Sequence, residues 1–334
     1  MIRRRHLKAA SRYLAYRFRD LHPFEVQASL LNACNLRCVY CKCPEIKTRL
    51  MTTKQWRAII HGLSALGTIR IKFQGGEPTL RPDFRELSAE AKASGMITST
   101  ISHGLTIASR PELLDYIDEL VISLDSTRPE INDRLRGEGT YHGAVKAIDL
   151  ALQRGVRTFV NMVLTRENVS DLEAMLEFCE DRGVRLNAQP VMFDSKYFDN
   201  EARALELTPN QFRTVHANLA RWKRQGRGLL FCAGTYEKAA GWLLPNEHTI
   251  RSVGESSCMA GKSYIHIEPN GDVHPCGLHG ADFAPKNIIK DGLEEALRHA
   301  QRHNCGDCWM PYLNERKAVF GLRPSALWEV VRRG

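Results

Sequence analysis

The feature that most constrains the fold of this chain is a regular alternation of short β-branched runs and helical stretches between residue 26 and about residue 190. Six runs have the length and composition of buried strands, and they span residues 26–31, 69–73, 97–101, 120–124, 158–164 and 184–189. Segments with helical periodicity lie between them, at residues 53–66, 83–94, 143–154 and 171–182. Because strands that alternate with helices pair in parallel, the pattern predicts an α/β fold with a helix-covered parallel sheet or barrel.

Glycines mark the ends of these predicted helices. Gly67, Gly95, Gly155 and Gly183 follow the four segments directly, and glycine is favoured there because it adopts a positive φ without steric cost. The motifs described below follow predicted strands. We therefore expect them at the carboxyl edge of the sheet, where α/β folds keep their sites.

After residue 190 the pattern changes. Residues 191–208 are predicted to form an irregular connection, and residues 209–225 and 233–244 are predicted to be helical. A β-hairpin is expected next, because short apolar runs flank Pro269-Asn270-Gly271 and Asn-Gly is a favoured hairpin turn. Helices at residues 291–303 and near residues 315–332 complete the chain.

The composition is that of a soluble globular protein, with 43% hydrophobic and 25% charged residues in 334. No apolar run approaches the ~20 residues of a membrane helix, and no signal peptide follows the N-terminus. Ten cysteines without an export signal favour the reducing cytosol, and thiolates that bind metal rather than disulfides. We expect a cytoplasmic protein with no nucleic-acid partner.

The net charge of +9 is concentrated in residues 1–20, which carry seven basic side chains and one acidic one. An amphipathic helix is predicted there, because Leu7, Ala10, Leu14 and Phe18 are spaced for one face. This helix either packs its apolar stripe on the protein core, or makes peripheral contact with an anionic membrane surface or an acidic partner protein.

Seven of the cysteines form two groups with different spacing. Cys34, Cys38 and Cys41 lie together after the first predicted strand. Iron–sulfur clusters are normally held by four thiolates, so three leave one coordination position open. A zinc site completed by Cys43 or a distant histidine, and buried structural cysteines, are the alternatives.

The second group is Cys258, Cys276, Cys305 and Cys308. A shell of four thiolates suits a structural zinc ion or a four-iron cluster equally well. Ligand chemistry alone therefore leaves the metal of this group open.

The first group resembles the signature of the radical S-adenosylmethionine (radical SAM) superfamily, in which an aromatic residue, here Tyr40, precedes the third cysteine. A second resemblance is the stretch Gly75-Gly76-Glu77-Pro78 after the second strand. The resemblance implies a [4Fe–4S] cluster on the three cysteines and binding of the SAM amino group by this stretch. Glycines allow close backbone approach, and a carboxylate suits an ammonium group.

Two serines match family positions more weakly. Ser102 and Ser123 end the third and fourth predicted strands, where relatives contact SAM, although capping of the next helix is an alternative role for both. His103 departs from the asparagine that relatives often carry. We expect both serines to be SAM contacts.

The resemblance also implies a fold and a reaction. The fold is a partial (β/α)6 barrel, and the reaction is reductive cleavage of SAM to a 5′-deoxyadenosyl radical that abstracts a substrate hydrogen. A flavodoxin- or ferredoxin-type protein is the expected electron donor.

The second group resembles the auxiliary-cluster domain of radical SAM enzymes in its short form, called twitch, which is related to the SPASM domain. It implies a small C-terminal domain of a β-hairpin and helices, with a fully ligated auxiliary [4Fe–4S] cluster that takes an electron from the substrate. Sulfatase-maturing relatives place an aspartate where this chain has Gly277. His274 and His279 flank that position and are the candidate catalytic residues, with surface histidines as the alternative.

These expectations define four regions: a basic helix at 1–25, the radical SAM core at 26–205, a helical connection at 206–257 and the auxiliary domain at 258–334. The leading hypothesis is oxidation of a small polar or sugar-like metabolite. The second is modification of a peptide or a lipid-linked precursor. The third is a non-enzymatic iron–sulfur or zinc protein.

Overall fold

The computed structural model describes residues 23–192, 196–198, 200–242, 258–277, 283–303 and 308–333. In these ranges one sheet runs through the molecule, with the strand order β6-β5-β4-β3-β2-β1-β7-β8-β9. Its parallel part consists of β1 (Glu25–Leu31), β2 (Arg70–Gly75), β3 (Ile97–Ser102), β4 (Glu119–Ser123), β5 (Arg157–Leu164) and β6 (Arg185–Pro190). Each of these strands lies within two residues of a predicted one. The predicted α/β fold with a partial (β/α)6 barrel is confirmed.

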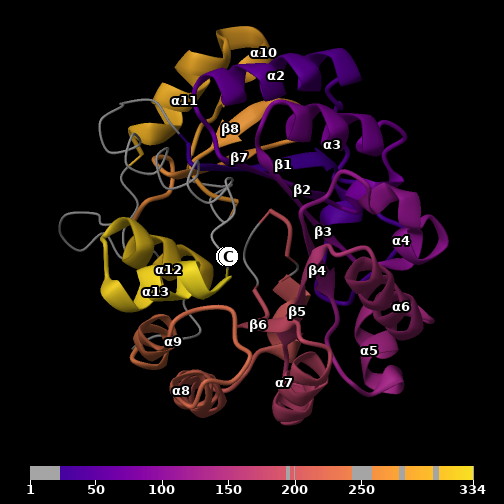
Figure 1. The fold of residues 1–334 in the computed structure, drawn as a ribbon, viewed down its shortest axis with the longest axis vertical. Helices are drawn as coiled ribbons and strands as arrows, with labels where there is room; N and C mark the ends of the chain where they lie inside the picture. Colours follow the sequence, from indigo (N-terminus) through magenta and orange to yellow (C-terminus); the bar gives the residue numbers. More distant parts are fainter. Residues whose placement is uncertain are drawn as a thin grey trace.

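Helices cover the outer face of the curved sheet (Figure 1). Up to β6 they are α2 (Thr53–Ala65), α3 (Phe84–Ala93), α4 (Leu105–Ser109), α5 (Pro129–Arg136), α6 (Thr140–Gln153) and α7 (Leu172–Asp181). The glycines predicted to end four of them have φ between 65° and 91°, as expected beyond a helix C-terminus. The sequence pattern does not predict α4 and α5, because five and eight residues are too few for a clear helical period.

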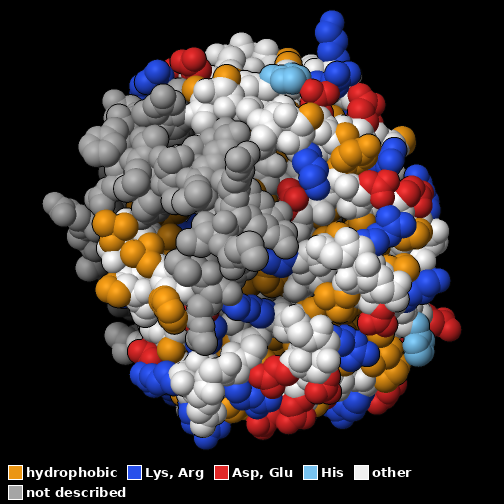
Figure 2. All heavy atoms as spheres, in the orientation of Figure 1, with side chains coloured by type: hydrophobic (Ala, Val, Ile, Leu, Met, Phe, Trp, Pro, Cys, Tyr) orange, Lys and Arg blue, Asp and Glu red, His pale blue; other side chains and the backbone are white. Residues whose placement is uncertain are grey.

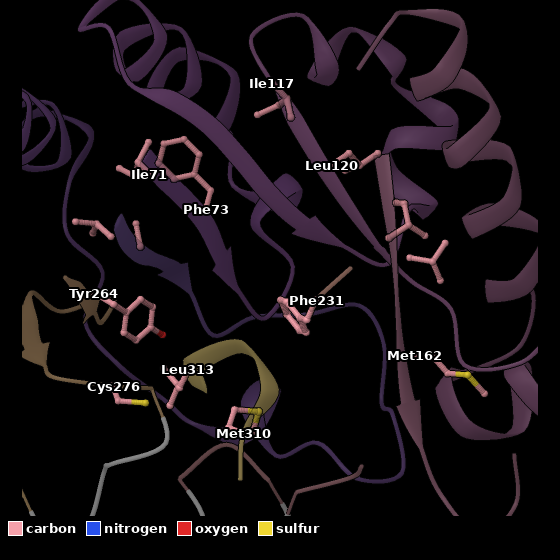
Figure 3. Packing of buried hydrophobic residues seen from close by; sticks show 14 of the residues in the cluster. Ile71, Phe73, Ile117, Leu120, Met162, Phe231, Tyr264, Cys276, Met310 and Leu313 are labelled. Atoms are coloured by element: carbon pink, nitrogen blue, oxygen red, sulfur yellow. The ribbon is translucent and has the colours of Figure 1, made fainter. Parts of the chain in front are cut away.

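The two faces of the sheet differ in polarity. On β2, Ile71 and Phe73 are fully buried in the core cluster (Figure 3). Arg70, Lys72 and Gln74 alternate with them and line the interior of the barrel. Burial of one such apolar side chain contributes about 1.5–3 kcal/mol. The outward residues therefore stabilise the barrel, and the inward residues of β2 place polar groups in its lumen.

The C-terminal region extends the same sheet. β7 (Tyr264–Ile267) pairs in parallel with β1, and β8 (Asp272–His274) returns antiparallel to β7. The predicted hairpin is thereby confirmed, with Gly271 in its turn at φ 94°. β9 (Lys286–Asn287) pairs with β8 at the edge. The region after residue 257 is thus joined to the barrel core by a continuous sheet.

The remaining helices lie in the second half of the chain. They are α8 (Pro209–Arg224), α9 (Ala233–Ala240), α10 (Ile288–Asp291), α11 (Leu293–Gln301), α12 (Pro311–Phe320) and α13 (Pro324–Arg333). The last two lie on the side of the barrel between β6 and β7 (Figure 1). The prediction of one helix near residues 315–332 is wrong, because Leu322 has φ 56° and Pro324 cannot continue a helix.

The basic segment at residues 1–20 lies outside the described residues, so its helix and its membrane contact stay predictions. No helix within the described ranges combines the length and the hydropathy that a membrane span requires.

Candidate active site

The inner face of the sheet and α12 surround a cavity of about 1970 Å³. Ordinary small-molecule sites occupy about 300–1,000 Å³, so this cavity has room for a nucleoside cofactor together with a substrate. Most of the predicted site residues line it, namely Cys34, Cys38, Tyr40, Cys41, Gly75, Gly76, Glu77, Ser102, Ser123 and Cys276. Pro78 is buried behind them, at the start of the short helix η2 (Pro78–Leu80).

The three clustered cysteines occupy the loop that follows β1. They are half-buried, and the loop is held by a hydrogen bond from the backbone N–H of Val39 to the carbonyl oxygen of Leu135, at 3.0 Å. Burial raises the pKa of the Cys38 thiol to about 11, although the nearby Arg136 opposes the shift. Binding of a metal cluster would therefore release protons from these thiols.

The donor set of this loop fits an iron–sulfur cluster. Among the described residues, no three Cys, His, Asp or Glu side chains converge closely enough to hold a single metal ion. A structural zinc ion requires four ligands around one centre, whereas a cluster distributes its thiolates over several irons. Cys43 lines the same cavity from a buried 3-10 turn, with its Sγ 3.8 Å from Asn32 Oδ1.

Gly75 and Gly76 allow two loops to approach each other closely. A Cβ on Gly75 would lie 2.1 Å from the carbonyl oxygen of Leu31, and one on Gly76 would lie 2.2 Å from that of Ala33. The backbone N–H of Gly76 donates to Leu31 O at 2.8 Å, and that of Glu77 donates to Ala33 O at 2.9 Å. The glycines thus fix the position of Glu77 relative to the cysteine loop.

Glu77 is a fully buried and well-anchored carboxylate. Its Oε1 accepts hydrogen bonds from Ser102 Oγ (3.0 Å) and from the backbone N–H and hydroxyl of Thr79, and its Oε2 accepts from the backbone N–H of His103 (3.0 Å). The His103 ring also contacts Asn35 Oδ1 at 2.8 Å, and burial lowers the pKa of this histidine. Ser102 therefore positions the carboxylate, and the His103 ring, with its Nε2 3.3 Å from Oε2, lies beside the second oxygen.

Tyr40 is part of a second buried network. Its hydroxyl donates to Asp125 Oδ2 at 2.5 Å. Arg136 Nη2 donates to Oδ1 of the same carboxylate at 3.0 Å, its Nε lies 2.8 Å from Oδ2, and the guanidinium lies 5.9 Å from the Tyr40 ring centroid. The backbone N–H of Val163 adds a fourth contact, at 2.8 Å. Asp125 and Arg136 were not among the predicted site residues, although Asp125 follows Ser123 by only two residues.

The second cysteine group is only partly described. Cys276 is buried directly after β8, and Cys258 and Cys308 pack against the same core cluster. Cys305 lies outside the described residues. The four-cysteine site stays a prediction.

The candidate catalytic histidines have different positions. His274 is buried with its Nε2 3.3 Å from Glu268 Oε1, outside the lining of the cavity, and His279 lies outside the described residues. His266 on β7 lines the cavity instead, with ring nitrogens 3.4 Å from Ser29 Oγ and from Gln74 Nε2. Burial lowers the pKa of His266 to about 4. Strand alternation, which puts His266 on the face of Tyr264, is the signal that would have identified it.

Known proteins resemble this chain across most of its length. The profile of the radical SAM superfamily matches residues 29–179. The PqqA peptide cyclase of Rhizobium meliloti is 26% identical over 323 residues, which cover 90% of this chain and 82% of the relative. The mycofactocin maturase MftC of Mycolicibacterium smegmatis is 31% identical over 291 residues, which cover 84% of this chain and 71% of the relative.

Solved structures share the fold. SuiB of Streptococcus suis bound to precursor peptide SuiA superposes with a TM-score of 0.65 at 18% identity, covering 93% of this chain and 76% of that chain. The enzyme anSMEcpe with bound AdoMet superposes with a TM-score of 0.63 at 16% identity, covering 91% of this chain and 97% of that chain. Because the maturase is 31% identical over most of both chains, and the profile spans the strands that carry the cysteine loop and Glu77, this chain belongs to the radical SAM superfamily and is a radical SAM enzyme.

Proposed function

We propose that this chain uses a SAM-derived radical to modify a precursor peptide. The observation that carries the proposal is the kind of relative, because a peptide cyclase and a maturase match 90% and 84% of this chain. These relatives favour the second of our hypotheses, a peptide substrate, over the first, a small polar metabolite. Membership of an enzyme superfamily leaves the non-enzymatic hypothesis without support.

We assign the first cofactors to the residues around the cysteine loop. Cys34, Cys38 and Cys41 would hold a [4Fe–4S] cluster, and Glu77 with the preceding glycines would face the amino group of SAM. Bound together, the cluster and SAM supply a 5′-deoxyadenosyl radical when a flavodoxin- or ferredoxin-type donor delivers an electron. Because Glu77 is already held by Ser102, it need not reorganise when it binds the ammonium group.

Four amide side chains that line the lumen suit binding of a peptide backbone. Gln74, Asn161, Asn187 and Gln189 line the cavity from three strands. An amide side chain both donates and accepts hydrogen bonds, so it can pair with the N–H and C=O groups of a peptide backbone. Asn187 donates to Asn161 Oδ1 at 2.6 Å, while its own buried Oδ1 has no hydrogen-bond partner among the described residues. A substrate N–H would satisfy this acceptor.

We also propose that Cys258, Cys276, Cys305 and Cys308 hold an auxiliary [4Fe–4S] cluster. Full ligation would leave no iron open to substrate and would suit electron transfer, so the expected net reaction is an oxidation of the peptide. His274 and His279 stay the proposed proton acceptors, and His266 joins them because its ring lines the cavity.

The proposal is tested with anaerobically reconstituted enzyme, SAM, dithionite and the short peptides encoded beside its gene. We expect 5′-deoxyadenosine together with a mass change in one peptide. The Cys38→Ala variant should lose both products, while Cys179→Ala, which alters a buried cysteine of α7, should retain them. Release of 5′-deoxyadenosine with unchanged peptides, but with oxidation of an added small metabolite, would restore the first hypothesis.

A further inference from the structure

A cluster of charged side chains occupies the part of the lumen toward the amino ends of the strands. It consists of Glu25 on β1, Arg70 and Lys72 on β2, Glu119 on β4, Arg157 on β5 and Arg316 on α12, all of which line the cavity. These are four cations and two anions, so the cluster carries a formal charge of +2. In the space-filling view, Lys and Arg side chains are visible near the middle of the face, beside the grey residues (Figure 2).

The arginines of this cluster are paired. Arg316 and the hydroxyl of Tyr312 contact Glu25, and Arg70 Nε lies 3.3 Å from the same carboxylate. Arg70 and Arg157 both contact Glu119. The two carboxylates are therefore engaged by the three arginines.

Lys72 is held differently. Its Nζ lies 3.7 Å from Glu25 Oε1, beyond hydrogen-bond distance, and 5.0 Å from the centroid of the Tyr312 ring. An ammonium group has three N–H donors, and its one acidic partner, Glu25, is shared with Arg70, Arg316 and Tyr312. Only 13% of the side chain is exposed, at a position that lines the cavity. A buried ammonium whose single acidic partner is distant and shared is costly, so an anion in the lumen would stabilise it.

We propose that Lys72 binds a carboxylate of the substrate, which rests on the proposed peptide function. The carboxylate belongs either to an acidic side chain of the peptide or to its C-terminus. A neutral group would leave the surplus positive charge of this cluster uncompensated, whereas a carboxylate compensates it and accepts hydrogen bonds from the ammonium group.

The location suits an anchor for the substrate. Lys72 precedes Gln74 by two residues on the same face of β2, a distance of about 7 Å along a strand. The stretch Gly75-Gly76-Glu77-Pro78, which is proposed to bind SAM, follows Gln74 directly. A peptide whose carboxylate binds Lys72 would therefore place neighbouring carbon atoms of the same or the next residue toward the SAM site.

The test compares three peptides that differ only in charge, by equilibrium dialysis against the reconstituted enzyme with SAM. They are N-acetyl-Ala-Glu-Ala-Ala-amide, N-acetyl-Ala-Gln-Ala-Ala-amide and N-acetyl-Ala-Gln-Ala-Ala with a free C-terminus. The first or the third should bind about tenfold more tightly than the neutral second, because a charge-assisted hydrogen bond is gained. Which of the two does so identifies the source of the carboxylate. Equal binding of all three by the wild-type enzyme would overturn the proposal.

Variants test whether Lys72 causes the preference for acidic over neutral peptides. Lys72→Met should abolish it, Lys72→Arg should keep most of it, and Lys146→Met, which alters an exposed lysine of α6, should leave it unchanged. A preference for acidic peptides that persists in Lys72→Met would overturn the assignment.

A further binding experiment distinguishes failure of the anion site from failure of the proposed peptide function. Glutarate and its diamide carry no peptide backbone, and preferential binding of glutarate should depend on Lys72 in the same way. Preference for glutarate without any peptide modification would support the anion site and count against the peptide function. Peptide modification with no preference for acidic probes would remove the anion site alone.

Discussion

Gly76 illustrates, at the scale of a residue, how close the two motif-bearing loops lie. A Cβ at this position would meet backbone oxygens of Ala33 and Asn32 at 2.2 and 2.3 Å, and backbone cannot move aside as a flexible side chain can. We expect Gly76→Ala to destabilise the protein by about 1–3 kcal/mol. Urea unfolding of the apo protein measures the effect. Gly234→Ala is the control, because nothing lies within 4 Å of its added Cβ and the residue is helical.

The direction of the stability change in the control variant Gly234→Ala can also be predicted. Alanine in a helix interior is favoured over glycine by roughly 0.5–1 kcal/mol, so Gly234→Ala should be neutral or stabilising. Equal stability of Gly76→Ala and the wild-type protein would contradict the close packing of the loops.

His216 should make the stability depend on pH. It is fully buried in α8, where its Nδ1 lies 2.9 Å from the carbonyl oxygen of Phe212, and burial lowers its pKa from 6.5 to about 4. Between these values the unfolded chain binds more protons than the folded one. The stabilisation is therefore complete above pH 6.5 and is lost as the pH falls toward 4, by about 3 kcal/mol in total.

Urea unfolding of the apo protein at several pH values across this window tests the prediction. His216→Gln should flatten the pH dependence relative to the wild-type protein. Parallel pH profiles for His216→Gln and the wild-type protein would show that His216 does not titrate as expected.

At the scale of an element, α12 supplies a cap to a helix that lacks its own. The residue immediately before α9 is Cys232, whose side chain makes no capping hydrogen bond. Glu315 of α12 accepts from the Cys232 backbone N–H at 3.0 Å and from Thr235 Oγ1 at 2.8 Å. A carboxylate at a helix N-terminus also interacts favourably with the helix dipole.

Removal of this cap should weaken the contact between the two helices. We expect Glu315→Ala to lower the free energy of unfolding by about 1–3 kcal/mol, since buried donors lose a charged acceptor. Glu294→Ala, at a side chain that is 67% exposed, should change it little. The measurement is thermal or urea unfolding, and equal losses in the two variants would show that the cap is not a stabilising contact.

The arrangement of the elements follows partly from local sequence. The six strands, four helices and their terminal glycines were predicted because each depends on residues close together in the chain. The break between α12 and α13 was missed, although Pro324 signals it. The inward position of α12 could not be predicted, because it depends on contacts such as that of Arg316 with Glu25 across the whole chain.

At the scale of the whole molecule, the iron content tests the two proposed [4Fe–4S] clusters. Reconstitution under anaerobic conditions should give about eight irons per chain, four in each [4Fe–4S] cluster. Cys38→Ala and Cys276→Ala should each lower this to about four, while Cys179→Ala, in the core of α7, should leave it unchanged. Iron and sulfide analysis is the measurement. About four irons together with one zinc in the wild-type protein would replace the auxiliary cluster with a structural zinc site.

The sequence by itself determined the fold class and the superfamily, and it predicted the residues of the first cluster site. Those properties depend on spacing within a few residues: the period of strands and helices, the cysteine loop and the glycines before Glu77. The tertiary structure alone decided that Ser102 anchors Glu77, that His266 lines the cavity while His274 pairs with Glu268, and that Lys72 faces the lumen beside α12. These contacts join elements that are far apart in the chain, and they form only when the curved sheet brings its inward side chains to one lumen.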